Sequence, residues 1–454
     1  MKTSREDLND VNKRSKNVIT VVGCGRRGLT TACILAEAGF NVICLDVNQY
    51  VVERIQKAIV PFDEPELKEI LPKIVKAKLL RATSNFEDAI PYSDTIFVMV
   101  PAILDERGRP DYSLLERACR NIGLILHPGT LIIVGSPLSP GTTESLLKET
   151  LETASGLKAG KDFGLAYSPA WILRGATINE LKENPIVLGA IDEDSYRRAE
   201  EILTTFSKDK IIKVRNMRTA ETVTLLKIIY QDVKKALANE ISELCEKMRI
   251  DFMEVMHSAN AQLKSQIPPP GIVEEHYSKD PYLLISEAES LRVKLRVVSA
   301  SRKVNETVYK RVLKLLRDAI RSCGKTASRA RVLILGLSSI PNLKNIEGSP
   351  VRQLISTLQR KGMSIRVYDP LFSYKELLEM GYETERSLLQ AARDTDCIII
   401  AVGHDRFKRL SLKRLKMVMR KPAAIVDLDH VLNYKEAERE GFIYRGLGRG
   451  VWSR

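Results

Sequence analysis

The sequence contains no apolar run of 18 or more residues, which argues against a transmembrane helix. Residues 1–16 are polar and charged and lack the apolar core of a secretory signal, so we expect a cytoplasmic protein without a membrane partner. The seven cysteines form no CxxC pair, and several lie within apolar segments. This pattern is typical of reduced, buried thiols, and we expect no metal site.

Aromatic residues are scarce, at 6% of 454 residues, whereas basic residues exceed acidic ones by 71 to 57 and give a net charge of +14. Such a balance favours anionic partners. Residues 406–421 are the densest basic segment, with cations at helical spacing, and its simplest interpretation is a solvated basic helix face. No aromatic residues interleave there as a stacking platform, which makes nucleic acid an unlikely partner.

A dinucleotide-binding fingerprint lies near the start of the chain. The apolar run 18–22 predicts a strand that ends in a GxGxxG turn of Gly23, Gly25 and Gly28, followed by a helical pattern. A second strand at 42–45 ends at Asp46. Glycines let backbone amides approach a pyrophosphate at the helix N-terminus, and an acid at Asp46 suits the ribose hydroxyls of NAD rather than the phosphate of NADP.

Two cations follow the turn. Arg26 and Arg27 lie in the first helical turn, where positive charge opposes the helix dipole at a cost of ~0.3–1 kcal/mol each. A nearby anion would remove this cost. The alternative is that both side chains point into solvent, and the sequence leaves the two interpretations open.

Strand-like apolar runs recur at 18–22, 42–45, 95–100 and 131–134, and again at 332–336, 364–368, 397–401 and 424–427. A helical pattern without glycine or proline covers about 220–250, and a second, basic one covers 291–322. The alternation predicts an α/β fold of two Rossmann-like doubly wound domains joined by a long central helical spine.

The sequence resembles the UDP-glucose/UDP-N-acetyl-D-mannosamine 6-dehydrogenase family over residues 18–450, and most closely its UDP-N-acetylmannosamine dehydrogenase branch. The motifs that carry the resemblance, besides GCGRRGL, are PFDEPELKEIL (61–71), LDERGRPDY (104–112), SPGTTE (139–144), LAYSP (165–169), ALANE (236–240), DPYL (280–283), GLSSIPN, SPV, VYDP and GFIYRGLGRG. The resemblance implies a polar tail (1–16), an NAD-binding Rossmann domain (17–205), a central helical dimerisation domain (206–322) and a UDP-sugar-binding-like α/β domain (323–454).

Family members are NAD-dependent oxidoreductases that convert the C6 alcohol of a UDP-sugar to a carboxylate, a role in polysaccharide precursor metabolism. A lysine and an acid-held water manage the alcohol proton, and a cysteine thiolate traps the aldehyde. The resemblance places the cysteine at His276, the lysine at Thr224 and the glutamate at Ala170. Of this central set only Asp280 is retained, so whether this chain is an enzyme stays open.

The resemblance also implies the remaining site residues. Cofactor contacts fall on Arg27, Pro101 and Ser136, besides the glycines and Asp46. In the last domain, a lysine and an arginine expected to face the substrate are replaced by Ile340 and Glu347.

Three functions follow as hypotheses. The first is an NAD-binding family member with impaired or altered catalysis. The second is a catalytically silent paralogue that serves as an NAD sensor or as partner subunit of an active dehydrogenase, in a homodimer or heteromer. The third is a two-electron dehydrogenase that uses His276 with Asp280, with Lys227 substituting for the lost lysine because it lies three residues after Thr224.

Overall fold

The computed structural model describes residues 14–105, 108–169, 183–207, 211–273, 275–346 and 348–449, apart from the side chains of 275–278. The chain forms two compact units. Unit 1 comprises residues 1–227 and 282–294, and unit 2 comprises residues 228–281 and 295–454. Helices α10 (Met217–Met248) and α12 (Glu275–Ser290) contribute to both units. The division into four parts predicted from the sequence stays a prediction.

Unit 1 contains an eight-stranded sheet with the order β10-β9-β8-β7-β4-β1-β2-β3. Its strands are β1 (Val18–Val22), β2 (Asn41–Leu45), β3 (Leu80–Thr83), β4 (Thr95–Val98), β7 (Leu131–Val134), β8 (Gly164–Tyr167), β9 (Ile186–Ala190) and β10 (Ile211–Lys213). All neighbours pair in parallel except β8 and β9, which are antiparallel. The chain runs outward from β1 through β2 and β3 and then returns to β4, so the order reverses at β1 and β4, where doubly wound sheets bind ligands.

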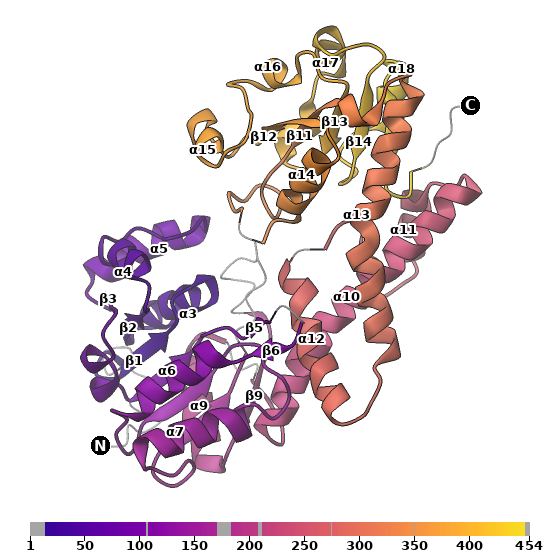
Figure 1. The fold of residues 1–454 in the computed structure, drawn as a ribbon. Helices are drawn as coiled ribbons and strands as arrows, with labels where there is room; N and C mark the ends of the chain where they lie inside the picture. The colour runs from indigo at the N-terminus through magenta and orange to yellow at the C-terminus, as the bar shows by residue number, and fades with distance from the viewer. Residues whose placement is uncertain are drawn as a thin grey trace. The chain divides into compact units, whose positions relative to one another are not determined.

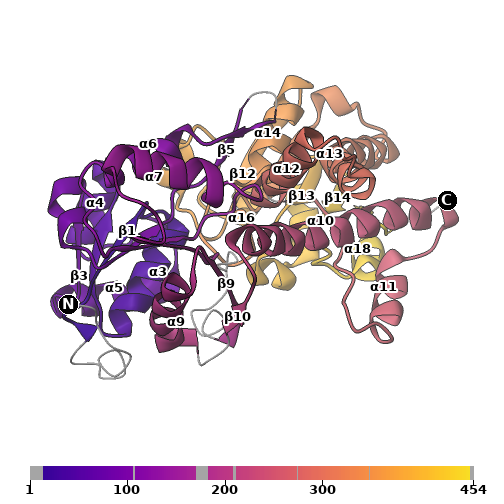
Figure 2. The same ribbon diagram turned by 90° about the horizontal axis from the view of Figure 1, so that it is seen from below.

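Helices cover both faces of this sheet (Figures 1 and 2). One face packs against α3 (Arg26–Glu37), α4 (Gln49–Gln56), α5 (Pro65–Lys76) and α9 (Glu193–Ser207), and the other against α6 (Ser113–Gly123) and α7 (Lys148–Ser155). Alternate residues of a strand point to opposite faces of the sheet. Val21 and Cys44 pack in the core beneath α3, and Val22 and Leu45 pack in the core beneath α6. A short hairpin of β5 (Ile103–Leu104) and β6 (Pro110–Asp111) follows β4.

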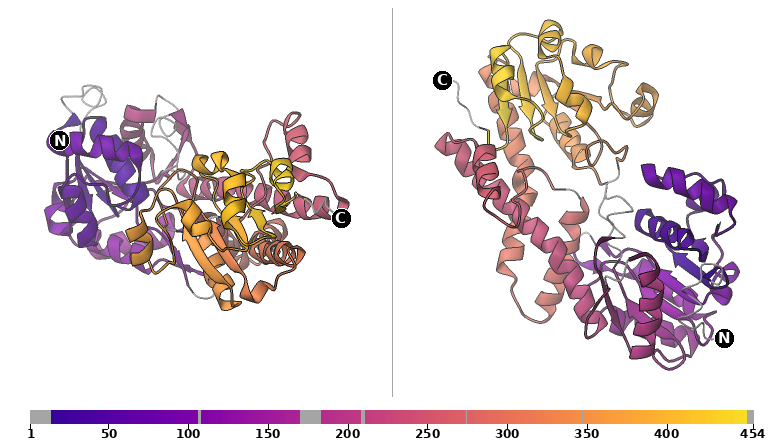
Figure 3. Two further views of the ribbon diagram at one scale, coloured as in Figure 1. Left: turned by 90° about the horizontal axis from the view of Figure 1, so that it is seen from above. Right: turned by 180° about the vertical axis from the view of Figure 1, so that it is seen from behind.

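Unit 2 contains a parallel five-stranded sheet with the order β12-β11-β13-β14-β15. Its strands are β11 (Arg331–Leu335), β12 (Ser364–Tyr368), β13 (Cys397–Ile400), β14 (Ala424–Asp427) and β15 (Ile443–Gly446). One face packs against α13 (Arg296–Ser322), α14 (Pro350–Arg360) and α15 (Tyr374–Glu379), and the other against α16 (Leu388–Ala392), α17 (Leu412–Val418) and α18 (Tyr434–Arg439) (Figure 3). Helix α11 (Phe252–Asn260) packs with α10.

The α/β fold with two doubly wound parallel sheets is confirmed, and so are the buried thiols, since all seven cysteines are buried and free. Two local predictions are wrong. The second long helix begins at Arg296 rather than 291, after a turn in which Arg292 has a φ of +58°. Residues 406–421 form two short helical segments, Asp405–Arg409 and α17, instead of one continuous face. Among the described residues, no helix is long and apolar enough to cross a membrane.

Candidate functional site

The turn that follows β1 has a backbone geometry that requires glycine. Gly23 has a φ of +90°, in the left-handed region. A Cβ on Gly28 would lie 1.8 Å from the Gly23 carbonyl oxygen, so only glycine lets α3 approach the turn this closely. A Cβ on Gly25 would meet no atom within 4 Å, which shows that the space at Gly25 is open.

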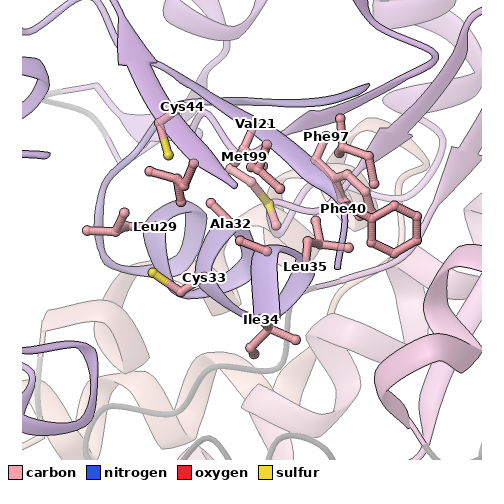
Figure 4. Close-up of a cluster of buried hydrophobic side chains, with 14 of the residues drawn as sticks. Val21, Leu29, Ala32, Cys33, Ile34, Leu35, Phe40, Cys44, Phe97 and Met99 are labelled. Carbon is pink, nitrogen blue, oxygen red and sulfur yellow. The ribbon is translucent and has the colours of Figure 1, made fainter. Parts of the chain in front are cut away.

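Helix α3 begins directly at this open space. Gly25 is its N-cap residue, and no side chain caps the first N–H groups. Uncapped N–H groups at the positive end of a 12-residue helix suit the pyrophosphate of a dinucleotide. Beneath the turn, Leu29, Ala32 and Cys33 of α3 pack onto the sheet and fix the direction of the helix (Figure 4).

Asp46 lies beside the glycine turn. Its carboxylate accepts hydrogen bonds from the backbone N–H groups of Cys24 at 2.7 Å and Asn48 at 2.8 Å. Each carboxylate oxygen retains a further acceptor position. The arrangement therefore matches the pair of ribose hydroxyls that an acid at this position is expected to bind.

Arg26 does not point into solvent. Its side chain is 10% exposed, forms an ion pair with Glu64 and donates to the Asp63 carbonyl at 3.0 Å. The guanidinium also lies 4.9 Å from the centre of the Phe62 ring. The anion that offsets the unfavourable position of Arg26 is therefore the protein's own Glu64, from the PFDEPEL segment. Arg27 is half-buried.

Two further predicted cofactor residues lie at the same edge of the sheet. Pro101 follows β4 and is exposed, and Ser136 follows β7 and is buried. Because β1, β4 and β7 are parallel, their carboxyl ends meet at the edge that carries Gly23. The structure thus brings the predicted dinucleotide site together at the point where the strand order reverses, and its residues fit NAD.

Three of the motifs that suggested the family contact one another in unit 1. The Tyr112 hydroxyl donates to Ser139 Oγ at 2.7 Å, and the Ser139 hydroxyl donates to the Leu283 carbonyl at 2.8 Å. These residues come from LDERGRPDY, SPGTTE and DPYL. Hydrogen bonds therefore connect these three motifs in the folded chain.

Glu221 is a site residue that sequence reasoning missed. Its buried carboxyl accepts hydrogen bonds from the Thr143 N–H at 2.9 Å, the Thr143 hydroxyl at 2.6 Å and the Gly141 N–H. Burial raises the pKa of Glu221, these hydrogen bonds offset part of the effect, and the resulting pKa is about 7. The residue ties the PGTT turn to α10, three residues before Thr224, and no local pattern in the sequence indicates this long-range contact.

This pKa predicts how stability depends on pH. Glu221 has a folded pKa of about 7 against an ordinary value of 4.5, so its protonated form is favoured in the folded state. Its contribution to stability is fully present below the unfolded pKa and is lost as the pH rises to about 7. Urea unfolding of wild type and Glu221→Gln should therefore differ in pH slope between about pH 5 and about pH 8. Identical slopes would contradict the assignment.

Thr224, to which the resemblance assigns the family's lysine position, has no basic group. Its side chain is 2% exposed, and its hydroxyl donates to the Ala220 carbonyl at 2.8 Å. The Tyr167 hydroxyl lies 3.5 Å from Thr224 Oγ1 and donates to the Ser136 carbonyl at 3.0 Å. Lys227 is exposed, although partial desolvation lowers its pKa. Thr224 and Lys227 therefore differ in exposure, and Lys227 does not take the buried position of the family lysine.

The backbone of His276 lies in the first turn of α12. Asp280 follows one turn later and is buried. Ala170 lies outside the described residues. The retained aspartate and the replaced cysteine position thus share one helix.

A buried network in unit 2 anchors the loop before α12. Arg302 and Asp232 form an ion pair with side chains 2% and 0% exposed, and Asn305 donates to both the backbone and side chain of Asp232 at 2.9 Å. Asn239 donates to Asn305 at 2.9 Å and accepts the Gly271 N–H at 2.8 Å. The network therefore anchors this loop at Gly271.

A second buried network organises the carboxyl edge of the unit 2 sheet. Asp369 accepts the N–H groups of Leu337 at 2.7 Å and Ser338 at 3.1 Å, and His404 Nε2 lies 3.1 Å from it. Because His404 Nδ1 accepts the Asn342 N–H at 2.9 Å, Nε2 carries the proton donated to Asp369. Burial raises the pKa of Asp369, but the hydrogen bond and charge of His404, together with the backbone N–H groups of Leu337 and Leu371, outweigh burial, and the pKa lies below its ordinary value.

The loop held by this network carries the positions that the resemblance assigns to substrate contacts. Ile340 is half-buried, and Glu347 lies outside the described residues. Lys344 pairs with Glu376 at 2.5 Å, and this contact lowers the pKa of Glu376 to about 2. An open cavity of about 830 Å³ lies nearby in unit 2, bordered by Arg302, Asn305 and the start of α14.

Comparison with known proteins agrees with this arrangement. Three models of the UDP-glucose/GDP-mannose dehydrogenase family match the chain: the NAD binding domain at residues 17–207, the central domain at 218–307 and the UDP binding domain at 333–434. The first match contains the glycine turn and Asp46, which confirms NAD as the cofactor.

The chain is 30% identical over 434 residues to the UDP-N-acetyl-D-mannosamine dehydrogenase of Pyrococcus horikoshii, with 95% of this chain and 99% of that protein covered. The protein of that name from Methanocaldococcus jannaschii is 29% identical, with 98% of this chain and 99% of that protein covered.

The solved Pyrococcus structure superimposes with a TM-score of 0.87 at 29% identity, over 95% of this chain and 99% of that one. An NDP-N-acetyl-D-galactosaminuronic acid dehydrogenase from Methanosarcina mazei gives 0.79 at 28% identity, over 98% of each chain. The chain therefore belongs to the UDP-glucose/GDP-mannose dehydrogenase family.

Proposed function

We propose that this protein binds NAD and a UDP-sugar of the UDP-N-acetylmannosamine type but does not complete the four-electron oxidation of that sugar. The observation that carries the proposal is Thr224. At the position that the resemblance assigns to the family lysine, the Thr224 hydroxyl is not basic enough to take up and hold the alcohol proton.

The dinucleotide half of the site supports NAD binding. Gly23, Gly25 and Gly28 would let the pyrophosphate approach the start of α3, and Asp46 would bind the ribose. When bound, NAD supplies a hydride acceptor. Arg26 is held by Glu64 and contributes to the structure of the turn.

Features of unit 2 support the binding of a nucleotide sugar. The UDP binding domain model covers the Asp369 and His404 network, and the curated relatives act on UDP-N-acetyl-D-mannosamine by name. The cavity of about 830 Å³ in unit 2 falls in the size range of small-molecule sites. These features support recognition of the ligand.

The set of residues that would carry out the oxidation is incomplete. His276 lacks the thiolate that would form a thioester, and its imidazole offers no equivalent route. Loss of a positioned acid–base group typically lowers a rate by 10²–10⁴-fold. Loss of both groups leaves no path to the carboxylate.

The proposal predicts steady-state kinetics. With excess NAD and either UDP-N-acetylmannosamine or UDP-glucose, we expect NADH formation at least ~10³-fold slower than that of the Pyrococcus relative. A comparable rate would overturn the proposal. Slow formation of one NADH per sugar that His276→Ala abolishes would instead support the two-electron alternative, with His276 as base.

The second candidate function is a catalytically silent NAD sensor or partner subunit. The observation that favours it is an apolar stripe on α10, where Leu226, Tyr230, Leu237, Leu244 and Met248 are each 49–60% exposed. Their spacing of four and seven residues places the last four along one side of the helix. Such a stripe is typical of an interface, either in a homodimer or with an active paralogue.

The stripe predicts an oligomer. We expect sedimentation velocity to show a dimer for the wild type and a monomer for Leu237→Glu with Leu244→Glu, because two buried charges would oppose association. Leu389→Glu, at a single exposed leucine on α16, is the control and should leave the dimer intact. A monomeric wild type would exclude the homodimer and leave the heteromer.

A further inference from the structure

A second pocket lies in unit 2, at the amino-terminal edge of the sheet. Its volume is about 420 Å³, and it is lined by the last turns of α13, the turn at 325–328 and the turn at 361–363. Strands β11 and β12 begin immediately after these turns, at Arg331 and Ser364. The loop of residues 336–346, which the Asp369 network holds, lies at the opposite, carboxyl edge. The pocket is therefore separate from the nucleotide-sugar region.

The lining of the pocket is strongly basic. Four cations (Arg317, Arg321, Lys325 and Lys361) and two hydroxyls (Thr326 and Ser328) contribute to it, and no acidic side chain does among the described residues. Cations of like sign that converge on one concavity repel one another unless an anion lies between them. Hydroxyls and guanidinium groups are the usual donors to phosphate oxygens.

Three of these cations have no competing acid. Lys325 pairs with Asp396 at 2.9 Å and donates to two carbonyls at 2.6 Å. Within the part of the chain that the structure describes, Arg317, Arg321 and Lys361 are exposed and form no ion pair. Asp318, which lies next to Arg317 in the sequence, is held by Arg445 at 2.8 Å.

The surface of α13 that leads to the pocket is predominantly basic. Lys303, Lys310 and Lys314 are exposed on α13 at a spacing of seven and four residues, and Arg317 and Arg321 continue this row into the pocket. The row would raise the local concentration of a multiply charged anion. The concave shape and the volume fit a small molecule better than a flat polyanionic surface.

We propose that this pocket binds a small ligand with two or more phosphate groups, such as a nucleoside diphosphate or a free pyrophosphate. The shared chemistry is the phosphoanhydride, which presents several oxygens to Arg317, Arg321 and Lys361. The proposal does not depend on whether the protein oxidises a sugar.

Calorimetric titration of the full-length protein with pyrophosphate tests this site. Excess NAD is present throughout, so that the glycine turn is filled and does not compete. We expect saturable binding that weakens with salt, and at least tenfold weaker binding for Arg317→Gln with Arg321→Gln, a variant that leaves the nucleotide-sugar region at the opposite edge of the sheet unchanged. Lys413→Gln with Arg414→Gln removes the same charge from exposed positions of α17 and should leave the affinity within about twofold.

The outcomes are distinct. Equal affinity in the wild type and the Arg317/Arg321 variant, or absence of saturable binding, would overturn the proposal, provided that circular dichroism shows the variant to be folded. Binding of heparin but not of pyrophosphate would also overturn it, in favour of a long polyanion. Parallel titrations with ADP and pyrophosphate distinguish a nucleotide from a free phosphoanhydride, and tighter binding of either supports the site.

Discussion

Replacement of Asp232 by alanine should lower the free energy of unfolding by ~3–5 kcal/mol, the largest single loss of stability that we expect. Asp232 is fully buried and pairs with Arg302, whose side chain is 2% exposed. Ser301 and Asn305 donate to the same carboxylate, at 3.1 and 2.9 Å. The alanine variant would remove the buried carboxylate from the guanidinium, whereas Ser301 and Asn305 would each keep one of their two acceptors.

The structure offers a matched control on the same arginine. Glu306 also approaches Arg302, at 3.5 Å, but its side chain is 46% exposed, so Glu306→Ala should cost less than ~1 kcal/mol. Asp232→Leu combined with Arg302→Met removes both charges and should recover much of the loss. Urea unfolding followed by circular dichroism measures all three variants. Equal effects of Asp232→Ala and Glu306→Ala would contradict the role given to the buried pair.

Gly28→Ala should lower NAD affinity at least ~10-fold and destabilise unit 1 by ~1–3 kcal/mol. Its Cβ would lie 1.8 Å from the Gly23 carbonyl oxygen and 3.3 Å from Met99 Cβ, so α3 must move away from the turn. Displacement of α3 would carry its first N–H groups away from the pyrophosphate position.

Gly25→Ala separates the two effects. Its Cβ meets no atom within 4 Å and its φ is −62°, so the fold should lose less than ~1 kcal/mol. The added methyl group nevertheless occupies the open space where the cofactor would lie, so NAD affinity should fall while stability is kept. If Gly28→Ala binds NAD as tightly as the wild type, the glycine turn is not the cofactor site.

Much of the fold could be predicted from short apolar runs with clear ends. The runs 18–22, 131–134, 364–368 and 424–427 coincide with β1, β7, β12 and β14. The break before Arg296 could not be predicted, because the left-handed Arg292 interrupts a segment whose composition is otherwise helical. The segment 406–421 shows the same limit, since cation spacing alone does not reveal that Leu410 and Ser411 separate two short helices.

The candidate site also contains some residues that the sequence predicts and others that it does not. The glycine turn could be predicted because its residues are neighbours in the sequence and their order has a direct geometric meaning. Glu221 and His404 could not be predicted, because each acts on a backbone group 78 or 62 residues away. Only the folded chain shows that the PGTT turn and the GLSSIPN loop depend on them.

The central claim is that this family member retains NAD but has lost the groups that complete the oxidation. A single-turnover reaction tests it most directly, with protein in excess over UDP-N-acetylmannosamine, NAD at saturation by calorimetry, and NADH counted per sugar. The account predicts saturable NAD binding and no formation of two NADH per sugar. Two NADH together with the sugar carboxylate would show that Thr224 and His276 do not prevent the chemistry and would contradict it.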